Sequence, residues 1–250
     1  MKTIIKFAAF AALAVVAVSC KKESKPKANG ECHIEMEYVW SMNNLPFTLN
    51  KTLYHPMTKD SLNFKTFKHY ISNIKLHNVD GTIWTDQESY YLVDLSNPSS
   101  MKIHLTNVPE GEYDRIEFTL GVDSLRNVSG VQSGALDPVN NMFWSWSSGY
   151  IMIKAEGIFQ KGNFSYHLGG FSGLNKAITQ KNLAFPNGEL LKINANASPV
   201  IHMKSNPAKL FHTHGSAEGA GGSMIHMPGS AATVMAQDFN SSVQIDHLHN

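Results

Sequence analysis

Cysteine is scarce in this sequence. The 250 residues include two cysteines, Cys20 and Cys32, and the first lies at the end of an N-terminal apolar stretch. That position leaves Cys32 as the one thiol inside the folded domain, and one thiol cannot form an internal disulfide. The lack of spare thiolates also disfavours a structural zinc site. The fold must therefore be stabilised by the packing of side chains.

Neither sign of charge is in excess. The chain carries 21 Lys and Arg against 20 Asp and Glu. Residues 1–19 hold two Lys and no acid, so the remainder is almost neutral as well. This balance argues against a surface for nucleic acids or other polyanions.

Motifs of common enzymes are also missing. The chain has no Gly-x-Ser-x-Gly, no glycine loop that would bind phosphate before a helix, and no His-Glu-x-x-His. The carboxylate pairs Glu35/Glu37 and Glu110/Glu112 fall on expected strands, where they look like solvent-facing charges. Because no nucleophile–base set is visible, we expect a protein that is not an enzyme.

The first 19 residues have the features of a secretory signal. Lys2 and Lys6 precede an apolar run from Phe7 to Val18, which is too short to span a bilayer. No later segment approaches the roughly 18 apolar residues of a membrane-spanning helix.

Residues 17–20, Ala-Val-Ser-Cys, resemble the bacterial lipobox, although Ala17 stands where Leu is usual. Cys20 is therefore expected to become a lipidated N-terminus that anchors the protein to a membrane of the bacterial cell envelope. The outer membrane is the favoured location. Residues 20–30, which contain four Lys, are expected to form a flexible tether.

The rest of the chain is dominated by short segments of alternating polarity. Ile34, Met36, Tyr38 and Trp40 alternate with Glu35, Glu37 and Val39, which predicts a half-buried strand. Similar strands are expected at 90–95, 116–120 and 151–155, and Asp80-Gly81 is a strong hairpin signal. Ser230 to Phe239 is the best helix candidate, with one further turn near Pro207–Phe211. The pattern predicts an all-β fold: one antiparallel β-sandwich-like domain over residues 31–250, with one or two short helices near the C-terminus.

Histidine and methionine are plentiful, with 12 and 11 residues respectively. Imidazole and thioether ligands suit copper. Local candidates are His212/His214, His226/Met227 and His247/His249; the first two flank or lie in a Gly-rich loop at residues 212–229. For any single pair an ordinary polar surface histidine is the favoured interpretation, and weak, adventitious metal binding is a further alternative.

Two of the four tryptophans, Trp144 and Trp146, are separated by a single serine. Residues i and i+2 share one face of a strand, so both indoles are expected beside Met142, with Phe143 and Ser145 on the other face. Strand geometry leaves open whether these indoles fill a core or serve a chemical purpose.

The middle of the chain resembles the MbnP-like family, copper-binding proteins associated with methanobactin operons, and their lipoprotein relatives. The similar segments are residues 70–81, 90–98, 108–124, 133–157 and 164–170. The most specific is the M-x-W-x-W-x-x-G-Y element, formed by Met142, Trp144, Trp146, Gly149 and Tyr150. The resemblance implies a mainly β protein that binds a single copper ion, as Cu(I), in the cell envelope.

The resemblance also implies a covalent modification. In the family, a partner diheme enzyme related to the MauG peroxidases oxidises the first Trp of W-x-W to kynurenine, which would be Trp144 here, with Trp146 unmodified. An indole N–H is only a donor, whereas kynurenine offers an aryl amine and a ketone. The family's His-Leu-Gly element falls at His167-Leu168-Gly169, so His167 is the best ligand candidate.

The second histidine cannot be matched in this way. His33 on the first strand and His226 beside the Gly-rich loop are the candidates, and the thiol of Cys32 is a weaker one because lone buried thiols are usually inert. The chain also departs from the family after Gly169, because Gly170-Phe171-Ser172 replaces a Ser-Thr-Gly-Cys-like segment and its disulfide.

Two functions remain for testing. The first is a copper-binding envelope lipoprotein that serves copper acquisition or homeostasis. The alternative is a β-sandwich lipoprotein that binds glycans or another protein, in which the W-x-W element is purely structural.

Overall fold

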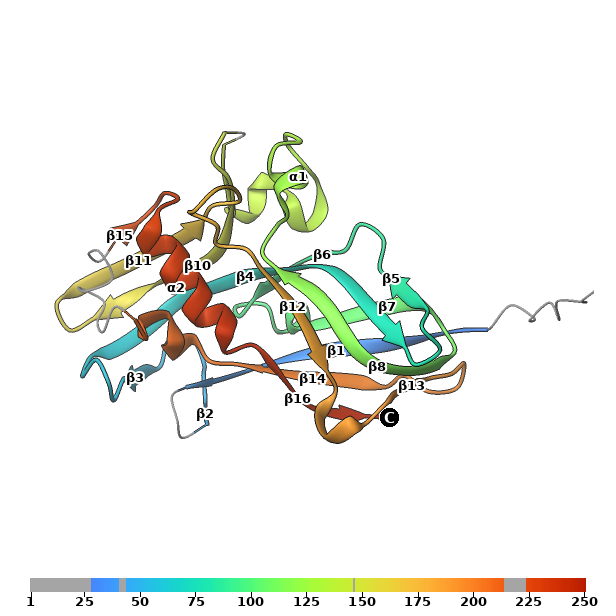
Figure 1. Ribbon diagram of the computed structural model, residues 1–250. Helices are drawn as coiled ribbons and strands as arrows, with labels where there is room; N and C mark the ends of the chain where they lie inside the picture. Colours follow the sequence, from blue (N-terminus) through green and yellow to red (C-terminus); the bar gives the residue numbers. More distant parts are fainter. Residues whose placement is uncertain (1–27, 41–43, 146, 214–223) are drawn as a thin grey trace, which may run out of the picture.

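The computed structural model describes residues 28–40, 44–145, 147–213 and 224–250. The expected signal peptide, Cys20, most of the tether, Trp146, His214 and the centre of the Gly-rich loop lie outside the described residues. The described residues form two sheets around one continuous apolar core (Figure 1).

The smaller sheet forms the lower layer in Figure 1 and is centred on strand β1. β1 pairs with β14, β7 and β2, and β14 pairs in turn with the edge strand β16. The strands are β1 (Asn29–Trp40), β2 (Leu45–Pro46), β7 (Lys102–Pro109), β14 (Val200–Ser205) and β16 (Gln244–His249).

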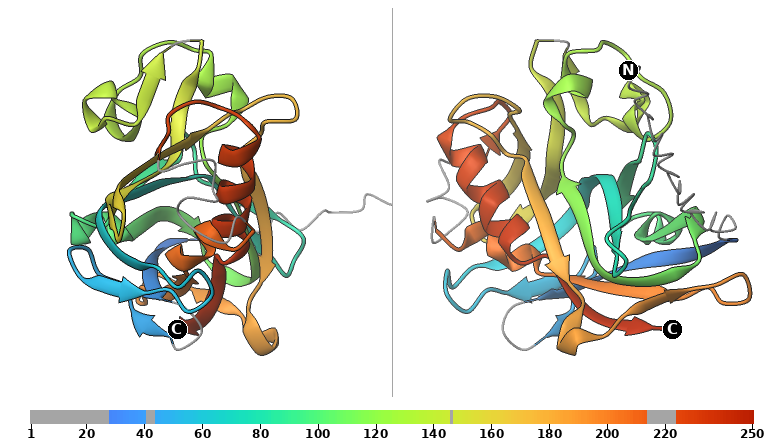
Figure 2. Two further views of the ribbon diagram at one scale, coloured as in Figure 1. Left: turned by 90° about the vertical axis from the view of Figure 1, so that its left-hand side faces the viewer. Right: turned by 45° about the vertical axis from the view of Figure 1, so that its right-hand side comes forward.

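The larger, strongly curved sheet is built along the path β12-β8-β4-β10-β11-β15, with short strands added at its sides (Figures 1 and 2). Its strands are β3 (Thr52–Tyr54), β4 (Ser61–Asn78), β5 (Ile83–Thr85), β6 (Tyr90–Asp94), β8 (Gly111–Leu120), β9 (Phe143–Ser145), β10 (Gly149–Phe159), β11 (Gly162–Gly169), β12 (Thr179–Ala184), β13 (Leu191–Ile193) and β15 (Met224–Ile225).

The alternation predicted for the first strand is confirmed. On β1 the side chains of Cys32, Ile34, Met36, Tyr38 and Trp40 are buried, whereas the residues between them face outward. A strand with this pattern has one register that buries its apolar face, because a slip by one residue would reverse both faces. The pattern therefore determines which side of the smaller sheet faces the core.

The 18-residue strand β4 connects most of the larger sheet, because it pairs with β3, β5, β6, β8 and β10. Its register with β8 shifts between Ser72 and Lys75, where Asn73 has a left-handed φ of 54°. Asparagine tolerates this conformation better than most residues, and such a bulge increases the local bend and twist of a strand. The bulge is a physical source of the curvature that Figure 2 shows.

Aromatic rings join the two sheets. Phe64 on β4 lies 5.0 Å from Phe164 on β11 and 5.7 Å from Trp40 on β1, measured between ring centroids. Phe67 on β4 contacts Phe239 in a helix near the C-terminus at 5.2 Å. Edge-to-face packing of this kind contributes beyond the burial of area. Both layers and the helix thus share one core.

The C-terminal helical segments are confirmed. α2 (Ser230–Ser241) buries Ala232, Met235, Ala236 and Phe239 at helical spacing. The turn near Pro207 is the 3₁₀ helix η5 (Pro207–Phe211), whose cap, Asn206, accepts a hydrogen bond from the Ala208 N–H. In the part of the chain that the structure describes, no helix combines the length and apolar character needed to cross a bilayer.

Short helical turns outside the C-terminal region complete the chain. α1 (Ser124–Asn127) belongs to the excursion between β8 and β10 at the top of Figure 1 and was not expected from the sequence. The Asp123 side chain caps it by accepting from the Arg126 N–H. The 3₁₀ turns are η1 (Pro98–Met101), η2 (Gly134–Leu136), η3 (Pro138–Asn140) and η4 (Pro186–Gly188).

The all-β, sandwich-like fold class is confirmed, with one refinement. Most pairs are antiparallel, but β1 pairs with β14 and β11 with β15 in parallel. Parallel neighbours need a long connection, and the connection between β1 and β14 contains every strand of the larger sheet except β15. Local sequence patterns do not reveal a pairing over such a distance.

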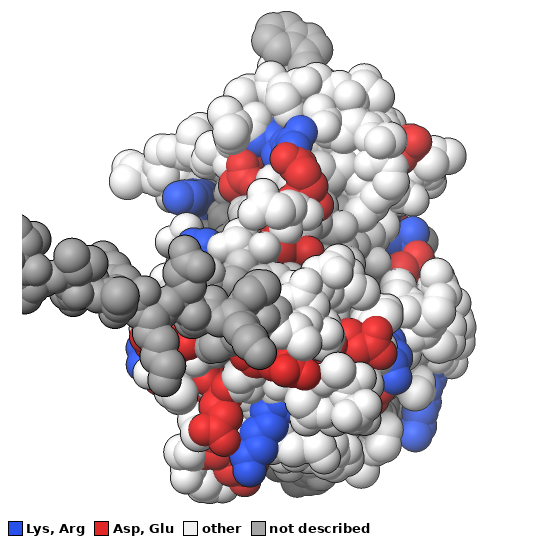
Figure 3. Space-filling model, turned by 90° about the vertical axis from the view of Figure 1, so that its right-hand side faces the viewer, with Lys and Arg blue, Asp and Glu red and all other residues white. Residues whose placement is uncertain are grey.

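Charged side chains of both signs are mingled on the surface. Figure 3 shows one face, on which acidic and basic side chains lie next to one another without an extended patch of a single sign. Ion pairs on the molecule include Lys75–Glu117 and Lys102–Glu35. That face matches the balance of charges in the sequence.

The buried histidine His69 on β4 provides a test of the core. Its Nε2 atom lies 2.5 Å from the Tyr38 hydroxyl, and burial lowers the pKa of His69 from 6.5 to about 4. As the pH falls, the unfolded chain therefore protonates this histidine at a higher pH than the folded protein does. The free energy of unfolding should decrease between pH 6.5 and about 4, by about 3 kcal/mol. Urea unfolding from pH 4 to 8 measures this decrease.

His69→Gln, which retains a partner for Tyr38, should flatten this part of the pH profile. The exposed His104→Gln is the control and should leave the slope unchanged. An identical slope in His69→Gln and the unmodified chain would show that His69 does not control this pH dependence.

Candidate metal-binding site

The hairpin of β10 and β11 positions the predicted ligand His167. The two strands are antiparallel, with Lys154 opposite His167 and Glu156 opposite Ser165. Phe164, Tyr166 and Leu168 of β11 are buried in the core, so Ser165 and His167 belong to the opposite face of the strand.

His226 lies directly against His167. It follows β15, which pairs in parallel with β11 at Ser165 and Tyr166. The two imidazole rings are stacked, with centroids 4.3 Å apart and an interplanar angle of 19°. Ser165 Oγ lies 2.8 Å from His226 Nε2 and 3.4 Å from His167 Nε2. The structure thus brings together His167 and His226, two of the three histidines that were candidates for the ligands implied by the family resemblance.

A carboxylate orients the His167 ring. Glu156 Oε1 lies 2.7 Å from His167 Nε2, and Lys154 Nζ lies 3.5 Å from the same carboxylate oxygen. When His167 Nε2–H donates to Glu156, the lone pair is on Nδ1 and is available to a metal ion. Metal-binding histidines commonly have such a carboxylate partner.

Electrostatics favour a neutral His167 and an ionised Glu156. Burial lowers the pKa of His167, and the hydrogen bond to Glu156 only partly opposes this effect. Burial alone would raise the pKa of Glu156, but the hydrogen bond with His167 and the charge of Lys154 outweigh it and lower that pKa. A neutral imidazole is the form that binds metals.

Trp144 packs against Gly169, the last residue of β11, which is two residues beyond His167. It is half-buried on β9, which pairs with β10. A Cβ atom at Gly169 would lie 2.5 Å from Trp144 Cζ3 and 2.8 Å from Cη2, so the six-membered ring of the indole lies against the glycine backbone. Because Gly169 and His167 share a strand face, the indole and the histidine pair lie on the same side of the sheet.

The other residues of the W-x-W element support this position. Met142 is buried, and the Phe143 ring lies 4.8 Å from that of the buried Tyr150. Gly149 has a left-handed φ of 74°, and a Cβ there would collide with the Asn127 side chain. The predicted alignment of Trp144 with Trp146 concerns a residue outside the described part of the chain.

The structure places His33 elsewhere. It lies on β1 in the smaller sheet, stacked on His104 with ring centroids 4.4 Å apart. No contact links it to His167 or His226 within the described ranges. Cys32 faces the core and is fully buried, which raises the pKa of its thiol to about 12 and keeps it protonated. It is therefore a poor metal ligand.

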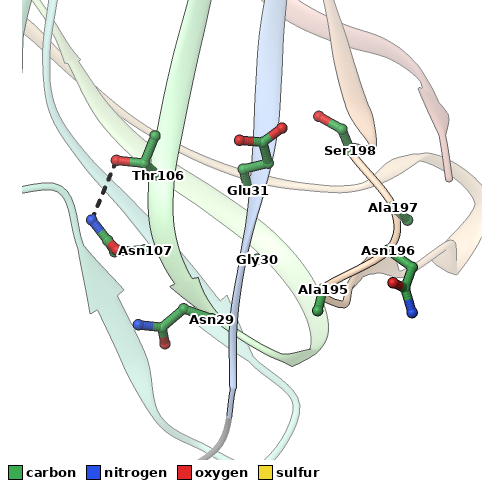
Figure 4. A pocket seen from close by; sticks show the side chains of 9 residues that line it. All are labelled: Asn29, Gly30, Glu31, Thr106, Asn107, Ala195, Asn196, Ala197 and Ser198. Atoms are coloured by element: carbon green, nitrogen blue, oxygen red, sulfur yellow. Dashed lines mark hydrogen bonds between the residues drawn. The ribbon is translucent and has the colours of Figure 1, made fainter.

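A polar hollow lies at the end of β1 near His33 and is lined by Glu31, Thr106, Asn107, Asn196 and Ser198, among others (Figure 4). The Glu31 side chain is drawn there between Thr106 and Ser198, and its carboxylate lies 2.8 Å from His104 Nε2. The hollow belongs to the smaller sheet and includes neither Trp144 nor His167.

Sequence reasoning missed Glu156 and Ser165 at the site. The turn residues Gln160-Lys161-Gly162-Asn163 were the available signal in the sequence, because the register of a hairpin follows from its turn. With Gly162 opposite Phe159, that register places Glu156 against Ser165. It also missed a cluster formed by His202, His247 and His249, since only the last two are neighbours in sequence.

Together, the fold and the site define a β-sandwich protein with a carboxylate-supported histidine pair beside a packed indole. A family model, MbnP, matches residues 29–227, and the chain belongs to that family. No curated protein matches the chain.

A solved structure, MbnP from Methylosinus trichosporium, is similar at a TM-score of 0.50 and 12% sequence identity. The similarity covers 74% of this chain and 78% of that one. At this identity it supports the fold and does not transfer individual site residues.

The contact between Trp144 and Gly169 can be tested directly. Gly169→Ala should displace the indole and destabilise the protein by about 1–3 kcal/mol, because the new methyl group overpacks the site. Thermal unfolding and the emission maximum of tryptophan fluorescence measure the two effects.

Gly229→Ala is the matched control. Nothing lies within 4 Å of a Cβ at Gly229, and its φ of 171° is ordinary extended backbone. If both variants show the same stability and emission as the unmodified chain, the close approach at Gly169 is not a constraint.

Proposed function

We propose that this protein is a cell-envelope lipoprotein that binds a single copper ion, as Cu(I), for copper acquisition or homeostasis. The observation that carries the proposal is the meeting of His167 and His226 on the face where Trp144 packs against Gly169. In this proposal the protein is not an enzyme, and Trp144 is the substrate of a diheme partner enzyme.

The donor set suits Cu(I). Soft and borderline ligands such as imidazole favour copper, and the side chain of His167 is only 16% exposed. His226 is exposed and can turn about its side-chain torsions from the stacked arrangement until both lone pairs converge on one ion. Ser165, which contacts both rings, would release His226 on that rotation.

Oxidation of Trp144 would complete the ligand set. The indole nitrogen is only a donor and cannot bind a metal. Opening of the ring by a peroxide-consuming partner, with ring carbon 2 leaving as formate, converts the side chain to kynurenine with an aryl amine and a ketone. The six-membered ring that contacts Gly169 is retained in that product, so the new amine would stay near His167.

Copper binding is tested with protein produced together with the diheme partner. Mass spectrometry should show kynurenine at position 144, and competition with a Cu(I) chelator should show one bound ion. His167→Ala and His226→Ala should each reduce the affinity for Cu(I) at least tenfold, since each removes a ligand. An unmodified Trp144 together with no Cu(I) uptake would contradict the proposal.

Two carboxylate variants distinguish two effects on Cu(I) affinity: the orientation of His167 by its carboxylate partner, and the general loss of a negative charge. Glu156→Gln should reduce the affinity about 10- to 100-fold by weakening the partner of His167. Glu117→Gln removes a similar carboxylate, 3.3 Å from His77 Nε2, and should have no effect. Equal losses in both variants would argue against a specific role of Glu156.

Membrane attachment has its own test. We propose that residues 1–19 are removed as a signal peptide, that Cys20 is lipidated, and that residues 20–30 tether the domain of residues 31–250. Cys20→Ser should abolish labelling with a radioactive fatty acid and release the protein from the membrane fraction. Retention of label in this variant would exclude Cys20 as the acceptor.

Binding of glycans or another protein through the indoles is the competing function. A glycan platform needs an exposed aromatic face, whereas Trp144 is half-buried against Gly169. No observation on the described residues favours that reading, so copper binding is the function we propose.

A further inference from the structure

A second group of histidines lies on the outer face of the smaller sheet. His202 is on β14, and His247 and His249 are on the neighbouring edge strand β16. His202 is directly opposite His247, and the buried Leu248 between the two β16 histidines places both on the outer face. β14 and β16 form the lower layer of the molecule, whereas β11 with His167 is in the upper layer (Figures 1 and 2).

The three imidazoles are close enough to share one ion. One nitrogen from each lies within 4.8 Å of those of the other two. His202 Nε2 and His249 Nδ1 are 3.3 Å apart. Two ligands on a tetrahedral zinc ion with Zn–N distances of about 2.0–2.1 Å are separated by about 3.3 Å, so this pair already has the spacing of a metal site.

The carboxylate of Asp246 orients one ring of the cluster. Asp246 Oδ2 lies 2.9 Å from His247 Nδ1, which leaves Nε2 of that ring for an ion. Lys204 Nζ donates to the other oxygen of Asp246 at 2.6 Å. The positive charge of Lys204 is therefore paired and does not face the cluster alone.

The buried ring of His202 provides a second, independent indication that an ion binds here. Its side chain is 11% exposed, and its Nδ1 atom is buried without a hydrogen-bond partner among the described residues. The nearest carboxylate oxygen, of Glu37 on β1, is 3.4 Å away but does not form a hydrogen bond in this arrangement. A buried polar atom without a partner is costly, and a cation bound by the ring would strengthen its attraction to Glu37.

We propose that His202, His247 and His249 form a second metal site, which binds a divalent first-row transition ion such as Zn²⁺. A closed structural zinc site usually has thiolate ligands, but three imidazoles with an open fourth position suit zinc, copper(II) or nickel without any thiolate. The nearby carboxylates of Glu37 and Asp246 favour a divalent charge. The fourth position would hold water. Because the site links β14 to the edge strand β16, a bound ion fastens the C-terminal strand to the sheet.

A neighbouring histidine pair provides an internal control. Glu31, His33 and His104 also lie close together on the outer face of the same sheet. That group offers two imidazoles instead of three, and His104 is already bonded to Glu31. In the register of the sheet, Val200 stands between His33 and His249, so the two groups are separate.

The test uses untagged protein made without the diheme partner and carrying His167→Ala and His226→Ala, so that the candidate copper site cannot contribute. Titration with Zn²⁺ against a chelating dye should give one site. His247→Gln and His249→Gln should each weaken it at least tenfold, whereas His33→Gln and His104→Gln should not. Zn²⁺ should also raise the midpoint of thermal unfolding, as an ion bound to the folded state must.

The His249→Gln variant should fold normally, because His249 is exposed and its replacement leaves the buried face of β16 intact. Cu²⁺ provides a spectroscopic check, since electron paramagnetic resonance should show nitrogen hyperfine structure that is reduced in His249→Gln. The proposal is overturned if Zn²⁺ does not bind, or if binding survives in His247→Gln and His249→Gln but is lost in His33→Gln.

Discussion

The aromatic core between the two sheets is the interaction on which the rest of the structure depends. Among the described residues Cys32 is the one cysteine and its thiol is free, so ring packing, together with hydrogen bonds such as Tyr38–His69, connects the layers there without a disulfide. Phe64 contacts Trp40 from the smaller sheet and Phe164 from β11. Because Phe164 and His167 are on the same short strand, the packing that joins the sheets also sets the position of the proposed copper ligand.

The two proposed metal sites have the same arrangement of side chains on different sheets. In each, a strand pair presents imidazoles outward, and a carboxylate 2.7–2.9 Å from one ring nitrogen holds the ring: Glu156 for His167 and Asp246 for His247. The sites differ in what completes them. The pair at His167 has an indole beside it that must be modified before it can coordinate, whereas the cluster on β14 and β16 has a third imidazole. This difference suits Cu(I) at the first and a divalent ion at the second.

Much of the fold followed from local patterns. The alternation in β1 and the helix near residue 230 depend on neighbours in sequence, and both were predicted correctly. The parallel pairing of β1 with β14 was not, because it is decided by contacts over more than 150 residues. At the proposed site, the family resemblance pointed to Trp144 and His167 as candidates, but it did not choose between His33 and His226. The structure places His226 beside His167 through the pairing of β15 with β11, which a two-residue strand does not signal.

By itself, the sequence determined the class of fold, the buried faces of its strands and the kinds of ligand available, since alternation and side-chain chemistry are local properties. It also placed the indole of Trp144 within a recognisable element. The tertiary structure alone decided which histidines meet: His226 lies against His167, His33 against His104, and His202 against His247. The last two contacts join two strands, and the first joins β11 to the residue that follows β15. Each therefore depends on sheet register, which residues distant in the chain establish together when the core packs.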